Sequence, residues 1–232
     1  IDDAVRGCVA SAFGYAGQKC SAASRIIVVG DIHDTFVERL VEAARSIVVG
    51  PPESPGSFMG PVIDAEAFDR INRAIEAGRK HAILALRGDV SHIDEGYYIG
   101  PTVFAEAPAN CAEIFGPVTA VIRARDFDHA IDIANGTRYA LTGGLYSRSP
   151  RHLHEASRRF NVGNLYLNRR ITGAIVGRQP FGGYKLSGVG SKAGGPDYLL
   201  QFVEPRTVTE NIIRRGFAPD VDLAEELERE IE

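Results

Sequence analysis

The sequence predicts an α/β domain whose mainly parallel sheet is covered by helices on both faces. Short apolar or β-branched runs alternate along the chain with segments in which apolar residues recur every three to four positions. Strands that alternate with helices are joined by crossover connections, and such connections give parallel pairing. The chain has 232 residues, of which 44% are hydrophobic and 24% charged, so it can bury a core of this kind.

The first half of the chain alternates predicted helices with short strands. Two aspartates, Asp31 and Asp64, each precede an amphipathic segment, and aspartate is a preferred capping residue. We therefore expect each of them to cap a helix, and we expect Gly78 to close the second helix. In chain order, the predicted elements are a helix that ends near Gly14, a strand at residues 26–29, a helix that stops at residues 50–52, the helix that Asp64 begins and a strand at residues 82–86.

The second half repeats this alternation and ends in a glycine-rich loop. Residues 168–196 have no period, and a connection of that length in a compact domain is expected to be functional. We divide the chain into a domain at residues 1–204 and a C-terminal segment at residues 205–232. In that segment, residues 207–209 predict an edge strand, which an acidic tail follows. The other predicted elements are strands at residues 118–122, 144–146 and 163–167 and helices at residues 127–134 and 150–160.

Composition and charge exclude several classes of function. The 26 basic residues are scattered and are outnumbered by 30 acidic ones, which gives a net charge of −4 and argues against a nucleic-acid partner. No apolar run approaches the roughly 20 residues of a membrane span. No signal peptide is visible either, so we predict a cytoplasmic protein. The helical pattern already runs at Ile1, which indicates a fragment of a longer chain.

The three cysteines are expected to be reduced thiols with different roles. Their number is odd, and none belongs to a CxxC pair. Cys8 lies on the apolar face of the first predicted helix and is expected to be core. Cys20 lies in a turn of small residues, where backbone amides and Lys19 would favour the thiolate that a nucleophile requires. An inert buried cysteine and a hydrolase that pairs Cys20 with a histidine both stay open, because spacing does not decide between them. No metal site is predicted.

Several motifs in the chain resemble those of the aldehyde dehydrogenase superfamily. The sequence GQKC at residues 17–20 resembles its nucleophile motif, and EIFGPV at residues 113–118 resembles its second signature. The resemblance covers about residues 1–205, and several motifs in one order are more specific than any one of them. The further matches are MGPVI at residues 59–63, GPTVF at residues 100–104 and PFGGYKLSG at residues 180–188.

This resemblance implies a cysteine-dependent oxidation of an aldehyde. Cys20 would add to the carbonyl carbon, and hydride would then pass to NAD, with NADP not excluded. Glu113 would accept hydrogen bonds from the nicotinamide-ribose hydroxyls, and Phe115 would pack beside the nicotinamide ring. In the superfamily, the cofactor-binding domain, an asparagine that holds the oxyanion and a glutamate that activates water all precede the nucleophile. We therefore expect all three upstream of this chain.

One loop narrows the expected substrate. The sequence TGAIVGRQPFGG at residues 172–183, together with Ser21, resembles the anchor loop of the Δ1-pyrroline-5-carboxylate dehydrogenase branch, which oxidises glutamate γ-semialdehyde in proline catabolism. The resemblance implies that the Ser21 hydroxyl and the amides of Gly173 and Ala174 hold the α-carboxylate of the substrate. It also implies that Phe181 lies along the aliphatic stem. Succinic semialdehyde is the alternative acidic substrate.

The resemblance also bears on the parent protein and on assembly. It leaves open a stand-alone enzyme or the C-terminal part of a bifunctional proline-oxidising protein. Members of the superfamily form homo-oligomers through a strand that follows the catalytic domain, and residues 206–212 are the candidate strand here. The non-enzymatic alternative is a fragment that folds and associates but is inactive alone, because the cofactor-binding surface, the asparagine and the general base are missing.

Overall fold

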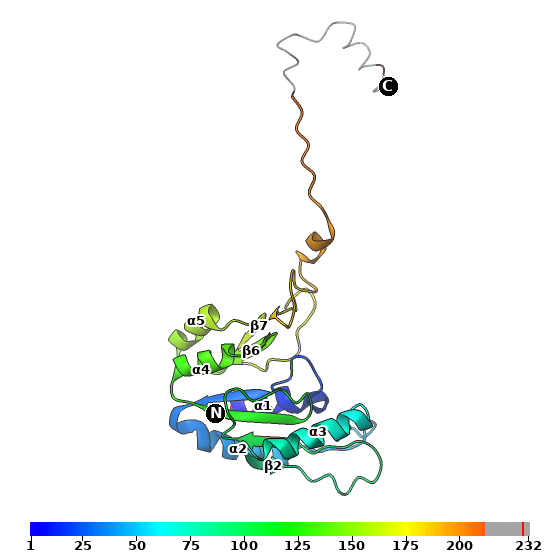
Figure 1. Cartoon of the computed structure of the whole chain (residues 1–232), viewed down its shortest axis with the longest axis vertical. Coiled ribbons are helices and arrows are strands. Elements are labelled where there is room, and N and C mark those ends of the chain that lie inside the picture. Colours follow the sequence, from blue (N-terminus) through cyan, green and yellow to red (C-terminus); the bar gives the residue numbers. More distant parts are fainter. Residues whose placement is uncertain (212–228, 230–232) are drawn as a thin grey trace. The chain divides into compact units, whose positions relative to one another are not determined.

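The structure, a computed structural model, describes residues 1–211 and residue 229. The chain divides into two compact units, Ile1–Tyr198 and Leu199–Glu232. The helices and sheets labelled in Figure 1 belong to the first unit. Among the described residues, no helix is both long enough and apolar enough to cross a membrane.

A four-stranded sheet forms the centre of the first unit (Figure 1). β1 (Arg25–Val29), β4 (Val118–Ala124) and β3 (Thr102–Ala105) are parallel neighbours in that order. β2 (Ile83–Arg87) pairs with β3 in the antiparallel direction and forms one edge of the sheet. The prediction of a mainly parallel sheet is confirmed.

Helices cover both faces of this sheet, as predicted. Successive side chains of β4 point to opposite faces of the sheet. Val121 points into the main core, to which the first three helices contribute their buried side chains. Ile122 belongs to a smaller core that includes Ile133 of the fourth helix. The four helices are α1 (Asp2–Phe13), α2 (His33–Arg45), α3 (Ala65–Gly78) and α4 (Phe127–Asn135).

A second strand–helix–strand unit follows the main sheet. β6 (Thr142–Leu145) and β7 (Asn164–Leu167) pair in parallel, and α5 (Pro150–Arg159) connects them. The predicted glycine-rich loop at residues 168–196, called the anchor loop below, leaves the carboxyl end of β7. Further short elements are the antiparallel pair β5 (Tyr139–Ala140) and β8 (Tyr184–Lys185) and the 3-10 turns η1 (Gly14–Gly17), η2 (Gly30–Ile32) and η3 (Tyr198–Phe202).

The two predicted helix caps have different outcomes. The Asp64 carboxylate accepts a hydrogen bond from the amide of Ala67 (2.8 Å), so it caps α3 as predicted, and α3 ends at Gly78. The prediction for Asp31 is wrong, because Asp31 lies within η2 and Ile32 precedes α2 without a side-chain cap. A capping residue needs an extended backbone, which Asp64 has (φ −159°, ψ 179°) and Ile32 lacks (φ −72°, ψ −12°).

The edge strand predicted at residues 207–209 is not formed in the single chain. Residues 203–211 are exposed and belong to no helix or strand. An edge strand needs a neighbouring edge that binds its amides and carbonyls, and such an edge can come from another subunit. Residue 212 and the predicted acidic tail lie outside the described residues, apart from residue 229.

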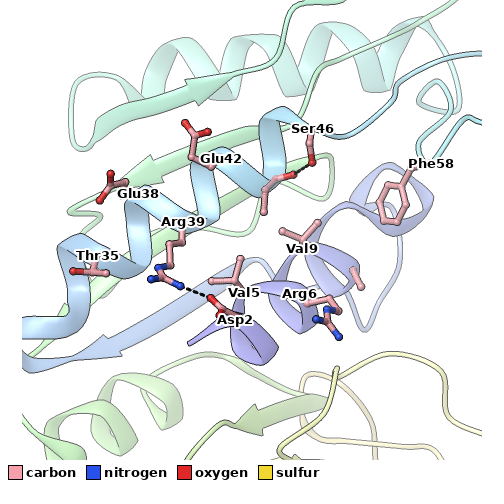
Figure 2. A pocket seen from close by; sticks show the side chains of 12 residues that line it. Asp2, Val5, Arg6, Val9, Thr35, Glu38, Arg39, Glu42, Ser46 and Phe58 are labelled. Atoms are coloured by element: carbon pink, nitrogen blue, oxygen red, sulfur yellow. Dashed lines mark hydrogen bonds and ion pairs between the residues drawn. The ribbon is translucent and has the colours of Figure 1, made fainter.

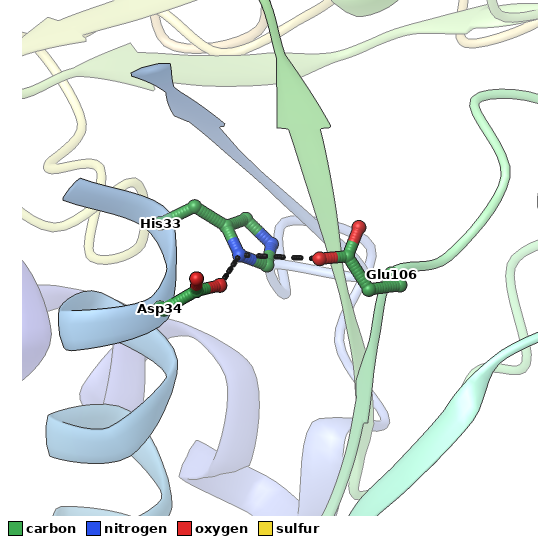
Figure 3. Close-up of side chains that lie close together, drawn as sticks. All are labelled: His33, Asp34 and Glu106. Atoms are coloured by element: carbon green, nitrogen blue, oxygen red, sulfur yellow. Dashed lines mark hydrogen bonds and ion pairs between the residues drawn. The ribbon is translucent and has the colours of Figure 1, made fainter. Parts of the chain in front are cut away.

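An ion-pair cluster joins the carboxyl ends of the parallel strands (Figure 3). His33 and Asp34 begin α2, Glu106 follows β3, and Arg123 lies in β4. The buried His33 ring places its Nδ1 atom 3.0 Å from the Asp34 carboxylate and 3.6 Å from the Glu106 carboxylate. Arg123 donates hydrogen bonds to both carboxylates. Because this cation already occupies both carboxylates, the cluster is an ion-pair network rather than a metal site.

Replacing Arg123 by glutamine is expected to weaken the dependence of stability on pH. Contacts with His33 and Arg123 hold the pKa of Asp34 below its usual range, and Arg123 does the same for Glu106. Their stabilisation is present above the ordinary carboxyl pKa of about 4 and is lost as the pH falls through the lower folded values. Arg123→Gln should lower the melting temperature at about pH 7, and that temperature should then fall less between about pH 5 and pH 3.

The matched control is Arg125→Gln, which removes another exposed arginine from the same segment. Thermal unfolding followed by circular dichroism across this pH range measures both variants. An Arg123 variant that loses stability on acidification as steeply as the unsubstituted chain would show that the cluster does not carry the pH dependence.

Candidate active site

The loop that carries Cys20, residues 14–24, connects α1 to β1 and is called the cysteine loop below. Residues 15–17 all have left-handed backbones (φ 57°, 53° and 66°), which turn the chain sharply after α1. Cys20 is exposed beyond this turn, whereas Ser21 is buried, with 5% of its surface accessible. The ammonium of Lys19 lies 4.0 Å from the centroid of the Tyr15 ring, and this cation–π contact holds it beside the turn.

The three cysteines differ in exposure. Cys8 and Cys111 are half-buried beside the two apolar cores. Burial raises the pKa of Cys8 to about 12 and that of Cys111 above its usual value, so both thiols resist ionisation. All three cysteines lie within the described residues, and Cys20 alone is exposed. The expectation that Cys8 packs against the core is confirmed. Cys20 is not buried, in contrast to the alternative of a buried thiol at this position.

The loop that carries Glu113 and Phe115 precedes β4 and is called the glutamate loop below. Arg70 of α3 donates hydrogen bonds to the carbonyl oxygens of Ile114 and Phe115, the latter at 3.1 Å. Phe115 has a left-handed backbone (φ 55°) and is 42% exposed. The Glu113 carboxyl is at the surface, yet partial desolvation raises its pKa against an opposing effect of Arg25. Both predicted cofactor-binding side chains are therefore accessible on a loop with a fixed backbone.

The cysteine loop and the glutamate loop lie side by side at the amino edge of the sheet. β1 and β4 are parallel neighbours, and each loop enters one of them. The two backbones meet at Gly17 and Gly116, because a Cβ atom on Gly17 would lie 2.0 Å from the Gly116 carbonyl oxygen. Only glycine allows this approach. Gln18 connects the cysteine loop to the segment before α3, because its Oε1 atom accepts a hydrogen bond from the amide of Ile63 (3.1 Å).

The anchor loop is tied to the same helix as the cysteine loop. The amide of Ile171 donates a hydrogen bond to the Ser11 hydroxyl oxygen on α1 (3.2 Å). Gly173 has a left-handed backbone (φ 84°), and among the contacts of the described residues the amides of Gly173 and Ala174 have no acceptor. Phe181 is half-buried. The structure thus connects all three loops that carry predicted site residues, two through the sheet edge and the third through α1.

Two surface grooves among the described residues lie away from these loops. One groove lies between α1 and α2 and is lined by side chains that include Asp2, Arg39 and Phe58 (Figure 2). Asp2 and Arg39 form an ion pair there. A second hollow, beside β7, is lined by residues that include Arg169 and Lys192. None of the residues predicted for the site lines either groove, so the candidate site in this chain is a set of loops at a sheet edge.

Two residues that support these loops carry no local sequence signal for that role. Arg70 resembles any exposed residue of an amphipathic helix, yet its guanidinium holds a loop 45 residues further on. Ser11 is visible in the sequence only as a polar residue near the apolar stripe of α1, and its partner Ile171 is 160 residues away. Contacts of this separation are a property of the fold and not of a motif.

These features define an α/β domain that presents an exposed cysteine beside a loop with an accessible carboxylate. The chain belongs to the aldehyde dehydrogenase family. The sequence profile of that family, described as Aldehyde dehydrogenase family, matches residues 1–208.

Named relatives are similar to nearly all of this chain. The 1-pyrroline-5-carboxylate dehydrogenase of Geobacillus sp. (strain WCH70) is 50% identical over 214 residues, which are 90% of this chain and 41% of that protein. The 1-pyrroline-5-carboxylate dehydrogenase of Bacillus subtilis (strain 168) is 47% identical over the same length and covers the same shares. This chain therefore spans 41% of the length of these relatives.

Solved structures share the fold. Proline utilization A from Bdellovibrio bacteriovorus superposes with a TM-score of 0.87 and 55% identity, over 94% of this chain and 23% of that one. The 1-pyrroline-5-carboxylate dehydrogenase from Thermus with bound NAD superposes with a TM-score of 0.83 and 49% identity, over 88% of this chain and 40% of that one. The resemblance inferred from the motifs is confirmed.

Replacing Gly17 by alanine is expected to separate the cysteine loop from the glutamate loop. The new Cβ atom meets the Gly116 carbonyl oxygen at 2.0 Å and stands on a left-handed backbone. Strain of this kind costs on the order of 1–3 kcal/mol, so Gly17→Ala should lower the free energy of unfolding by about that amount.

Gly14→Ala is the matched control in the same turn, because Gly14 has a negative φ (−56°) and a Cβ atom added there would meet nothing within 4 Å. Urea unfolding of both variants measures the difference. Equal stability of the two would remove the argument that the backbones of the two loops touch.

Proposed function

We propose that this chain is the catalytic part of an NAD-dependent dehydrogenase that oxidises glutamate γ-semialdehyde, formed from Δ1-pyrroline-5-carboxylate, to glutamate. The observation that carries the proposal is the exposed Cys20 on a loop packed against the loop that bears Glu113. Family membership and 50% identity to a 1-pyrroline-5-carboxylate dehydrogenase support the same reaction. The same membership argues against a hydrolase that pairs Cys20 with a histidine.

In this proposal Cys20 divides the oxidation into two easier steps. Its sulfur forms a bond to the aldehyde carbon, and the amide of Cys20 stabilises the oxyanion of the resulting thiohemiacetal. Loss of hydride from that carbon leaves a thioester on Cys20, which water hydrolyses to the carboxylate product and the free thiol. NAD supplies the hydride acceptor when it is bound. The asparagine that completes the oxyanion site and the general base that activates water are proposed to lie upstream.

Glu113 and Phe115 fit the ribose and the nicotinamide ring of NAD. An accessible carboxylate offers two acceptor oxygens, which match the two adjacent hydroxyl donors of a ribose. The exposed Phe115 ring offers a flat apolar surface, and Arg70 fixes the backbone that carries it. The similar enzyme from Thermus was solved with bound NAD, which favours NAD over NADP for this chain.

The anchor loop and Ser21 are proposed to select an aldehyde that carries a carboxylate. Two backbone amides without an acceptor, those of Gly173 and Ala174, can bind a carboxylate without the help of a cation. The half-buried Phe181 supplies an apolar wall for the carbon chain between the two ends of the substrate. Succinic semialdehyde, which has one carbon fewer between its carboxylate and its aldehyde, is the second candidate substrate.

We further propose that the chain turns over only together with the segment that precedes it in its relatives. This chain spans 41% of those relatives, and the cofactor-binding domain of the family precedes the nucleophile. The parent protein is either a stand-alone dehydrogenase or a longer protein of the kind called proline utilization A. Residues 206–212 are proposed to pair with a neighbouring subunit, because residues 203–211 form no strand alone.

The first test concerns the thiol. In the full-length protein that carries this chain, Cys20→Ala should abolish NADH production from glutamate γ-semialdehyde and leave NAD binding measurable by calorimetry, because only the bond-forming atom is lost. The isolated chain should be alkylated at Cys20 by iodoacetamide but should produce no NADH. Cys111→Ala is the control, since its half-buried thiol takes no part in the proposed reaction. Retained turnover in the Cys20 variant would refute the nucleophile.

The second test concerns the anchor for the carboxylate. Ser21→Ala should raise KM for glutamate γ-semialdehyde about tenfold, because a hydrogen bond to a charged group is worth about 1.5 kcal/mol or more. KM for an uncharged aldehyde of similar length should change little. Ser24→Ala is the matched control, since Ser24 lies in the same loop just before β1. Equal effects of Ser21→Ala on both substrates would remove Ser21 from the anchor.

A further inference from the structure

Ser11 lies near the end of α1 and makes two long-range hydrogen bonds. It is almost fully buried, with 3% of its surface accessible. Its backbone carbonyl accepts a hydrogen bond from the amide of Ala23 (3.0 Å). Its hydroxyl oxygen accepts one from the amide of Ile171 (3.2 Å). One residue of a rigid helix therefore contacts both the cysteine loop and the anchor loop.

The first of these bonds closes the cysteine loop. Residues 12–22 lie between Ser11 and Ala23, and they include Cys20. Ala23 is also held from β4, because the buried Thr119 hydroxyl donates a hydrogen bond to the Ala23 carbonyl oxygen (3.0 Å). Cys20 precedes Ala23 by three residues, which span at most about 10 Å of extended chain. The end of the loop that carries the thiol is therefore restrained relative to both α1 and β4.

The second bond fixes the start of the anchor loop. Ile171 packs against the main core and precedes Gly173 by two residues, which span at most about 7 Å. The Ile171 amide finds its acceptor in the Ser11 hydroxyl and not in the backbone. The Ser11 hydroxyl is therefore one of two contacts, with the packing of Ile171, that set the position of the Gly173 and Ala174 amides relative to the thiol.

We propose that Ser11 is a positioning residue that sets the separation between the Cys20 thiol and the anchor-loop amides, and that it thereby selects acidic aldehydes by their chain length. The inference rests on the proposed function, because it assumes that these amides hold the substrate carboxylate. A substrate held at both ends is discriminated by the distance between those ends. Glutamate γ-semialdehyde and succinic semialdehyde differ by one carbon in that distance, so a shift of the anchor loop changes their relative KM values.

Ser11→Ala separates the two bonds, because alanine keeps the backbone carbonyl that binds Ala23 and loses only the hydroxyl that binds Ile171. In the full-length protein, KM for glutamate γ-semialdehyde should rise about tenfold, because a shift of the anchor amides by a fraction of an ångström misplaces the group that holds the carboxylate, and a misplacement of about 1 Å can cost about a hundredfold. The ratio of its kcat/KM to that of succinic semialdehyde should fall, and kcat and KM for butanal should stay within about twofold. A general loss of structure would instead affect all three aldehydes together.

Thr102→Val is the matched control. It removes a buried hydrogen bond of similar length, from the Thr102 hydroxyl to the Gly100 carbonyl oxygen (3.0 Å), and leaves both bonds of Ser11 in place, so the ratio between the two acidic substrates should stay as it is. If Ser11→Ala does not fold, Ser11→Cys keeps nearly the same volume with a much weaker acceptor and should show a smaller shift in the same direction. An unchanged ratio in a folded Ser11 variant, or an equal change in the Thr102 variant, overturns the inference. An unsubstituted enzyme without preference for acidic over neutral aldehydes would overturn the proposed function itself.

Discussion

The parallel pairing of β1 with β4 is the constraint on which the candidate site depends. Arg25 lies opposite Ala120 in this pairing, so the segments that enter the two strands reach the same edge of the sheet together. Side chains alternate between faces along a strand, and a slip of one residue would exchange the main core for the smaller one. The close approach of Gly17 to Gly116 then fixes how the two loops lie against each other. The register of a buried sheet thereby determines which residues can meet at its edge.

The cysteine and glutamate loops of the candidate site lie at the amino edge of this sheet, which is unusual for open α/β sheets. Ligands in such sheets commonly bind beyond the carboxyl ends of the strands. Here the carboxyl ends are joined by the cluster of His33, Asp34, Glu106 and Arg123, in which one guanidinium binds two carboxylates. Loops at the amino edge lack a following helix on which to rest. The glutamate loop relies on a helix from elsewhere, which explains the long-range contact of Arg70 on α3.

Most regular elements follow from the sequence, and the differences have physical causes. Segments with a clear apolar period, such as α3 and β4, lie within a few residues of their predicted bounds. The strand β3, which is buried along its whole length, has no alternation and the sequence does not predict it. Asp31 and Asp64 are the same residue type before similar helices, yet only one has the backbone of a cap. The local sequence does not predict this difference in backbone conformation.

In the candidate site, too, the sequence predicts some features and not others. Motifs identify Cys20, Glu113 and the anchor loop, because each needs a special residue type on a short segment. No motif indicates how these segments are held, because Ser11 and Ile171 are 160 residues apart. The edge strand expected at residues 207–209 is not formed for another reason. A strand there requires the edge of a partner sheet and not only a suitable sequence.

In the proposed function the Glu113 carboxylate holds two ribose hydroxyl groups, and its raised pKa bears on how an accessible carboxylate could do so. Partial desolvation raises this pKa and Arg25 opposes the effect, so the folded protein has already removed part of the water from the carboxyl group. The free-energy cost of removing this water is incurred when the protein folds and not when a ligand binds. An acceptor that is already partly dehydrated, on a backbone that Arg70 holds rigid, loses less solvation and less conformational freedom when hydroxyl donors arrive. Preorganisation of this kind favours a carboxylate that is accessible but not fully hydrated, which is the state in which the glutamate loop presents Glu113.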